Sequence, residues 1–137
     1  MTDPDPVAPL LDLLRPEYSA DYWADEIAVQ AAMTLEALSD EAWARLEQAI
    51  TAEPAGARAR LATALRHAPS DRTTELLVAL LRSAEPEVGV AATTSLFEQY
   101  HFWLPMVSLR DELQRHLRTA GPELGPQIEA LLARVTD

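Results

Sequence analysis

Apolar residues recur every three or four positions along most of the chain, a spacing that predicts amphipathic helices. The clearest example is the stretch 85–100, where Val88, Ala92 and Leu96 fall on one side of a helix and Ser95 lies beside them. Small residues on such a face let a neighbouring helix approach closely. We therefore expect the helix over 85–100 to be covered from more than one side.

Prolines mark the ends of the predicted helices, because proline cannot donate the backbone hydrogen bond that a helix interior requires. Acidic or hydroxyl side chains next to several of these breaks provide N-terminal caps. From these signals we predict helices over residues 9–14, 21–38, 40–53, 55–67, 71–83, 86–100, 109–120 and 126–135. We find no segment with the alternation typical of a strand. The sequence therefore predicts an all-α protein with about seven to eight helices.

The chain has 137 residues, enough for one domain with a buried core, so we expect residues 1–137 to form a single domain whose residues 1–8 are flexible. Cysteine is absent, which excludes disulfides and thiolate metal sites. The acidic, proline-containing start does not resemble a secretory signal, and no run approaches the roughly 18 apolar residues of a membrane span. We therefore expect a soluble cytoplasmic protein.

Acidic residues are concentrated in the first part of the chain. Residues 1–53 hold twelve Asp and Glu residues and two arginines, whereas residues 54–137 hold ten acidic residues and nine arginines. An acidic field repels nucleic acid and anionic membranes and attracts cationic proteins. The alternative is that the acidic surface serves solubility alone. The distribution favours a basic protein partner over nucleic acid or a membrane.

The helical pattern also repeats. A shift of 31 positions places Leu46 on Leu77, and Leu65 on Leu96. Repeats of this length, each built from a pair of helices, are typical of solenoid proteins. We interpret the pattern as two tandem helical hairpins, followed by a weaker third unit over 109–135.

The second helix of the repeat resembles the HEAT family, in which this helix begins with an acidic residue, Pro, Glu and Val and continues through alanines to an Ala-Leu pair. The matching residues are Glu85, Pro86, Glu87, Val88, Ala91, Ala92, Ser95 and Leu96. Gly89 stands where the family commonly has an arginine. The resemblance covers residues 39–99 and implies a HEAT-like α-solenoid of antiparallel helical hairpins. Members of the family are mostly protein-binding scaffolds, and some are small bacterial immunity proteins, which this compact acidic chain resembles.

We find no motif for catalysis or for a cofactor. The three histidines, His67, His101 and His116, have no partner at the spacing of metal ligands, and the isolated glycines form no phosphate loop. Serines occur at predicted caps or in the small-residue face, without a base nearby in the sequence. We therefore expect no enzyme activity, no cofactor and no bound metal.

Two groups of residues are candidates for contact with a partner. The first group combines aromatic and acidic side chains near the start of the helix over 21–38, a composition that suits a basic partner. It comprises Tyr18, Asp21, Tyr22, Trp23, Asp25 and Glu26, with Glu36 further along the same helix. The alternative is that Tyr22 and Trp23 hold this helix against its neighbours.

The second group follows the helix over 85–100 and comprises Tyr100, Phe102 and Trp103. A connection of this apolar character binds a partner or fills the space between the second repeat and the last helical pair.

These features favour binding over catalysis. Our main hypothesis is an immunity-type inhibitor, a protein that neutralises a basic bacterial toxin, for example a nuclease, by covering its basic site with the first group. The alternative is a general HEAT-repeat scaffold or adaptor without an inhibitory role, which binds through the second group.

Overall fold

A computed structural model of the chain describes residues 6–68, 70–99 and 109–134, and the regular structure within these residues is helical. The elements are α1 (Val7–Leu14), α2 (Ala20–Tyr22), a π-helical segment η1 (Trp23–Ile27), α3 (Ala28–Glu36), α4 (Asp40–Ile50), α5 (Ala55–Leu65), α6 (Asp71–Leu81), α7 (Pro86–Gln99), α8 (Leu109–Thr119) and α9 (Gly125–Arg134). Because α2, η1 and α3 follow one another without a break, they form one continuous helix over residues 20–36. The described part of the chain thus holds eight helical stretches, and the all-α prediction is confirmed.

Serine side chains cap the starts of α4 and α6. The Ala42 N–H donates a hydrogen bond to Ser39 Oγ at 3.2 Å, and the Thr73 N–H donates one to Ser70 Oγ at 3.1 Å. Each bond satisfies a backbone donor that the first turn of a helix leaves unpaired. α7 begins at Pro86, where the missing backbone N–H costs no hydrogen bond. The sequence signals for these helix starts are local, which explains why they could be recognised.

Several helices end earlier than the apolar pattern predicts. α3 ends at residue 36, α5 at residue 65 and α6 at residue 81, two residues before the predicted ends. Beyond these ends the backbone N–H groups bond to the carbonyl three residues back, as in Leu38 to Leu35 and Ser83 to Leu80. The chain therefore leaves each helix through a tightened turn, which keeps side chains near their helical positions for a few more residues.

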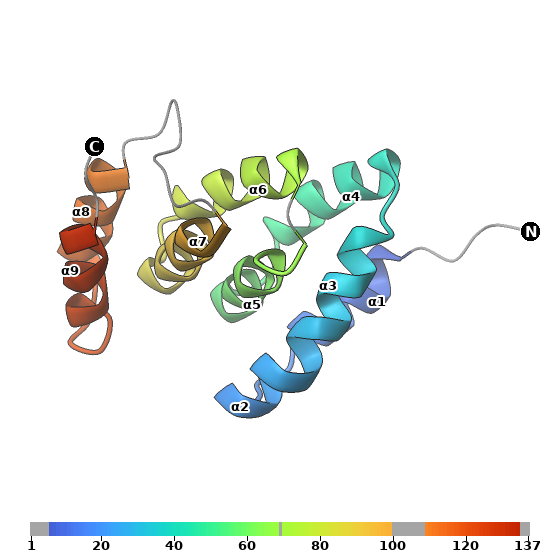
Figure 1. Cartoon of the computed structure of the whole chain (residues 1–137), viewed down its shortest axis with the longest axis horizontal. Helices are drawn as coiled ribbons and strands as arrows, with labels where there is room; N and C mark the ends of the chain where they lie inside the picture. The colour runs from blue at the N-terminus through green and yellow to red at the C-terminus, as the bar shows by residue number, and fades with distance from the viewer. Residues whose placement is uncertain (1–5, 69, 100–108, 135–137) are drawn as a thin grey trace, which may run out of the picture.

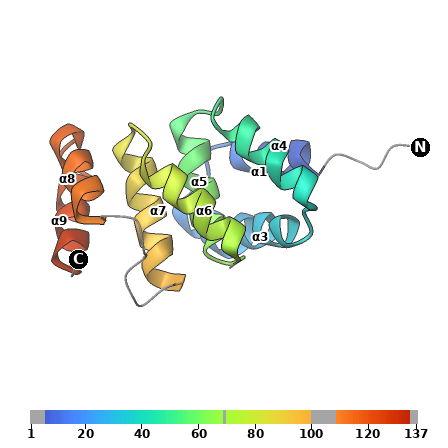
Figure 2. The same ribbon diagram turned by 90° about the horizontal axis from the view of Figure 1, so that it is seen from above.

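The helices form two layers with a further pair at one end (Figure 1). α4 and α6 lie side by side in one layer, and α3, α5 and α7 lie in the other. α5 packs against both α3 and α7, while α1 packs against α3, α4 and α5. α8 and α9 pack against each other and against α7, at the opposite end of the molecule from α1 (Figure 2). α5 and α7 are therefore the centre of the fold.

Small side chains bring α5 and α7 close together. Ala57, Ala62 and Ala64 of α5 are buried, as is Ala92 of α7, and Ser95 Oγ donates a hydrogen bond to the Ala62 carbonyl oxygen at 2.7 Å. Because the serine side chain is short, its hydroxyl group reaches the main chain of α5 only if the axes of α5 and α7 lie close together. The expectation that α7 is covered from more than one side is confirmed, because α5, α6 and α8 all pack against it.

The largest fully buried side chains of the core include leucine and isoleucine positions that the helical pattern places inward. These side chains are at most 2% exposed: Leu46, Ile50, Leu61, Leu65, Leu77, Leu81, Leu96, Leu113 and Ile128. Burial of one such side chain contributes roughly 1.5–3 kcal/mol relative to full exposure. The core therefore runs through both layers and into the α8–α9 pair.

Candidate protein-binding surface

The helix over residues 20–36 carries the large apolar side chains that the described part of the fold leaves in solvent. Tyr22 is 51% exposed, Val29 is 46% exposed and Met33 is 66% exposed. Val29 and Met33 are four positions apart within α3, so they lie on the same side of it, and Tyr22 precedes the π-helical segment on the same continuous helix. Scattered single apolar residues are normal on a protein surface, whereas several exposed apolar residues on one helix are of the kind found at interaction sites.

The same helix carries exposed acidic side chains. Asp21, Asp25, Glu26 and Glu36 are exposed, and none of them forms an ion pair with a residue in the described ranges. Their charges are therefore uncompensated by the fold itself. We use the term α2–α3 surface for Asp21, Tyr22, Asp25, Glu26, Val29, Met33 and Glu36.

Tyr18 and Trp23 also belong to the first predicted group, but their side chains pack against the rest of the fold. Trp23 is only 8% exposed, and the Tyr18 ring stacks on it with centroids 5.8 Å apart. The Tyr18 hydroxyl donates a hydrogen bond to the Leu13 carbonyl oxygen at 2.9 Å, which connects the helix to the end of α1. The Tyr22 ring lies 5.8 Å from the Tyr18 ring. Of the three aromatic residues, Tyr22 alone is more than half exposed, so we leave Tyr18 and Trp23 out of the contact surface.

The π-helical segment contributes Asp25 and Glu26 to this surface. Trp23 and Ile27, at its two ends, are both buried. A π-helical turn holds more residues than an α-helical turn, so it rotates the following side chains relative to the preceding ones. After the segment, Ala28, Ala31 and Leu35 continue the buried side. Segments of this kind are frequent at functional sites, but the sequence pattern does not distinguish them from an ordinary helix.

The second predicted group, Tyr100, Phe102 and Trp103, lies outside the described residues.

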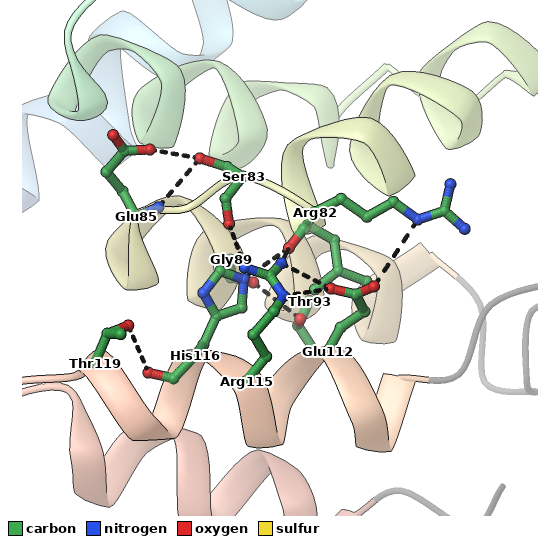
Figure 3. A network of polar contacts seen from close by, with 10 residues as sticks. Arg82, Ser83, Glu85, Gly89, Thr93, Glu112, Arg115, His116 and Thr119 are labelled. Atoms are coloured by element: carbon green, nitrogen blue, oxygen red, sulfur yellow. Dashed lines mark hydrogen bonds and ion pairs between the residues drawn. The ribbon is translucent and has the colours of Figure 1, made fainter.

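A buried polar cluster joins α8 to the end of α6 (Figure 3). His116 is fully buried, and its Nε2 lies 2.7 Å from the Leu81 carbonyl oxygen. Because a carbonyl oxygen only accepts, Nε2 carries the proton and donates it. Nδ1 then carries a lone pair, and it has no hydrogen-bond partner among the described residues. His116 therefore lies inside the core.

Gly89 makes room for this imidazole. A Cβ atom built on Gly89 would lie 2.2 Å from His116 Nε2 and 2.4 Å from its Cδ2. Real Cβ atoms do not approach other atoms so closely, and the ring is held in place by its bond to Leu81. Glycine at position 89 therefore has a packing reason in this chain.

Arg115 completes the contact between α8 and α6. Its NH1 donates to the Ser83 carbonyl oxygen at 3.2 Å, and its NH2 donates to Glu112 Oε2 at 2.7 Å (Figure 3). The carbonyl groups at the end of a helix have no partner within that helix. Together, Arg115 and His116 supply donors from α8 to the end of α6, so α8 serves as a cap for α6.

A second polar contact lies between α5 and the connection from α6 to α7. The sequence pattern places Arg58 on the outer face of its helix, but its side chain is only 16% exposed. Arg58 NH1 lies 3.0 Å from Glu85 Oε2 and donates to Ser83 Oγ at 2.9 Å. A long guanidinium side chain can lie along apolar surface and still reach a carboxylate, which helical periodicity does not reveal. Arg58, with the Ser83 hydroxyl, lowers the pKa of Glu85 to about 2.

We expect this contact to give the protein an acid-dependent component of stability. The pKa of Glu85 is lower in the folded chain, so its contribution is complete above about pH 4.5 and is lost as the pH falls toward 2. Because Glu85 is 43% exposed, the contribution should stay below about 1 kcal/mol. Urea unfolding between pH 5 and pH 2 should show the wild type and Glu85→Gln converging at the acid end. If the free energies of unfolding of the wild type and Glu85→Gln differed by the same amount at every pH, this assignment would be contradicted. The variant Glu87→Gln, at an exposed neighbouring position, serves as the control.

Within the described ranges, no group of three or more His, Cys, Asp or Glu side chains is arranged to hold a metal ion. The helices in these ranges also lack the combination of length and apolar character that a membrane crossing requires.

Comparison of the chain with protein-family models, with curated proteins and with solved structures gives no match.

Proposed function

We propose that this chain is a protein-binding domain whose α2–α3 surface receives a basic protein. The observation that carries the proposal is that Tyr22, Val29 and Met33 are exposed on one continuous helix that also carries exposed carboxylates without ion-pair partners in the described ranges. Apolar anchors surrounded by a charged rim are the usual anatomy of a protein interface. Carboxylates that the fold leaves uncompensated complement lysine and arginine side chains of a partner.

The proposed architecture for this role is a HEAT-like stack of helical hairpins. It is supported by the two layers, with α4 and α6 in one and α5 and α7 in the other, and by the small-residue contact between α5 and α7. In such a stack the helix over residues 20–36 lies at one end of the described residues, and its outer side is exposed among them. This position leaves the α2–α3 surface available to a partner.

Within this class we favour an immunity-type inhibitor that acts in the cytoplasm by neutralising a basic toxin. The carboxylates of the α2–α3 surface would occupy the place of phosphate groups in a nuclease cleft, or cover another basic site. This role requires one-to-one binding and no chemistry, in agreement with an interface formed by exposed side chains on one helix. A scaffold role without inhibition is the alternative.

Co-expression with the product of the neighbouring open reading frame tests the inhibitor role. We expect that product alone to arrest growth, and we expect this chain to restore growth and to co-purify with it in a one-to-one complex. A complex with a harmless neighbour would favour the scaffold role. Failure of the pair to associate, with both proteins folded, would contradict inhibition of that neighbour.

A further inference from the structure

The π-helical segment η1 holds one residue more than the same turn of an α-helix would hold. The Ala28 N–H donates to the Trp23 carbonyl oxygen, five positions back instead of the four of an α-helical turn. One extra residue rotates the part of the helix before it, relative to the part after it, by about 100°, the angle between successive residues of an α-helix. The segment therefore fixes the rotational position of α2 relative to α3, which we call the π register.

The π register places Trp23 on the buried side of the helix. Ala28, Ala31 and Leu35 define that side within α3, and they are buried, as is Trp23. Without the extra residue, Trp23 would be rotated about 80–140° away from these three residues. The Tyr18 ring, with its centroid 5.8 Å from that of Trp23, adds a stacking contact in the same position. Burial of the indole is therefore gained only with the π turn.

The large apolar side chains that are exposed among the described residues fit the other register. Tyr22, Val29 and Met33 are separated by seven and four positions, so an uninterrupted α-helix would hold them within about 40° of one another. We call this arrangement the α register. In the π register, Tyr22 is instead rotated about 80–120° from Val29 and Met33. The helix thus carries two apolar patterns, one that needs the π turn and one that needs its absence.

We infer that η1 is a register switch for the α2–α3 surface. The free chain holds the π register, which buries Trp23, and the chain bound to its partner adopts the α register, which brings Tyr22 into line with Val29 and Met33 as one apolar strip. A partner shifts such an equilibrium only through its different affinities for the two states, and alignment of the strip supplies that difference. The inference rests on the proposed function, because contacts of the partner with the strip offset the exposure of Trp23.

NMR couplings across hydrogen bonds test the switch in the free chain, because they identify the carbonyl group that accepts from the Ala28 N–H. We expect the carbonyl of residue 23 in the wild type. In Trp23→Gln, which no longer gains from burial at this position, we expect the carbonyl of residue 24, the α-helical acceptor. Met33→Gln, an exposed change on the same helix, should keep the wild-type acceptor. A folded Trp23→Gln variant that keeps the acceptor at residue 23 would overturn the inference.

Deletion of Ala24 tests the switch independently and separates it from the proposed function. Without the extra residue the helix is α-helical throughout and keeps Trp23 buried, but Tyr22 can no longer align with Val29 and Met33. We expect a urea midpoint at or above that of the wild type, an affinity for the co-purified partner at least tenfold lower, and little further loss from Tyr22→Ala. Wild-type affinity in the deletion variant would overturn the switch. If Met33→Ala still weakened binding, the proposed function would stand without it.

Discussion

Replacement of Gly89 by alanine is expected to lower the free energy of unfolding by about 2–4 kcal/mol, because overpacking and a broken buried hydrogen bond outweigh the better helix propensity of alanine. The new Cβ would lie 2.2 Å from His116 Nε2. The ring must move, and the bond to the Leu81 carbonyl oxygen is lost with it. Urea unfolding measures the loss, and hydrogen exchange should show that amides of α8 and α9 lose protection first.

A double-mutant cycle with His116→Ala isolates this contact. Once the imidazole is removed, alanine at position 89 meets no ring, so Gly89→Ala should be neutral or stabilising by up to about 1 kcal/mol in that background. We therefore expect a large coupling free energy between positions 89 and 116 in this cycle. Equal destabilisation by Gly89→Ala in both backgrounds would show that the glycine is needed for another reason.

Truncation of Met33 or Tyr22 to alanine is expected to weaken binding of the partner protein at least tenfold, because buried apolar anchors contribute most of the energy of an interface. Met33 is 66% exposed in the free chain, so its removal should change the free energy of unfolding by less than about 0.5 kcal/mol. Titration calorimetry with the co-purified partner measures the affinity, and urea unfolding measures the stability.

Gln127→Ala provides the matched control, since Gln127 is exposed on α9, at the other end of the molecule. It should leave both the affinity and the stability unchanged. Unaltered affinity in both Met33→Ala and Tyr22→Ala would move the interface away from the α2–α3 surface.

The sequence predicted the helices well because the information for them is local. The positions Leu76, Leu77, Leu80 and Leu81 follow the helical period, and all four are buried. Proline and serine at the breaks specify where helices begin through chemistry within one turn. These features need no knowledge of distant contacts, so the all-α class could be derived from one sequence.

Contacts between distant residues could not be derived in this way. Gly89 and His116 meet across two helices, and no local pattern in either segment indicates the other. Arg58 of α5 reaches Glu85 in the connection from α6 to α7, although the helical period places Arg58 outside. The way in which arginine side chains and the imidazole ring pack between helices depends on the angle at which those helices cross. The sequence pattern does not specify this angle.

The candidate surface was predicted in part. The carboxylates Asp21, Asp25 and Glu26 are exposed, as their positions indicated, whereas Trp23 is buried. Val29 and Met33 were not predicted, because the predicted contact surface was based on aromatic residues next to acidic ones. Val29 and Met33 are four positions apart on the polar side of the helix, a spacing that the sequence itself displays.

The most direct test of the proposed function is the association rate constant with the partner protein at about 50 mM and about 500 mM salt, since screening weakens electrostatic attraction over this range. We expect the wild-type rate to fall at least tenfold at the higher salt, and we expect Asp21→Lys/Asp25→Lys/Glu26→Lys to associate slowly at both. The control variant Glu123→Lys/Glu129→Lys should retain the wild-type rates. Equal rates for the wild type at the two salt concentrations, unchanged by charge reversal of the α2–α3 surface, would contradict the proposal that this surface receives a basic protein.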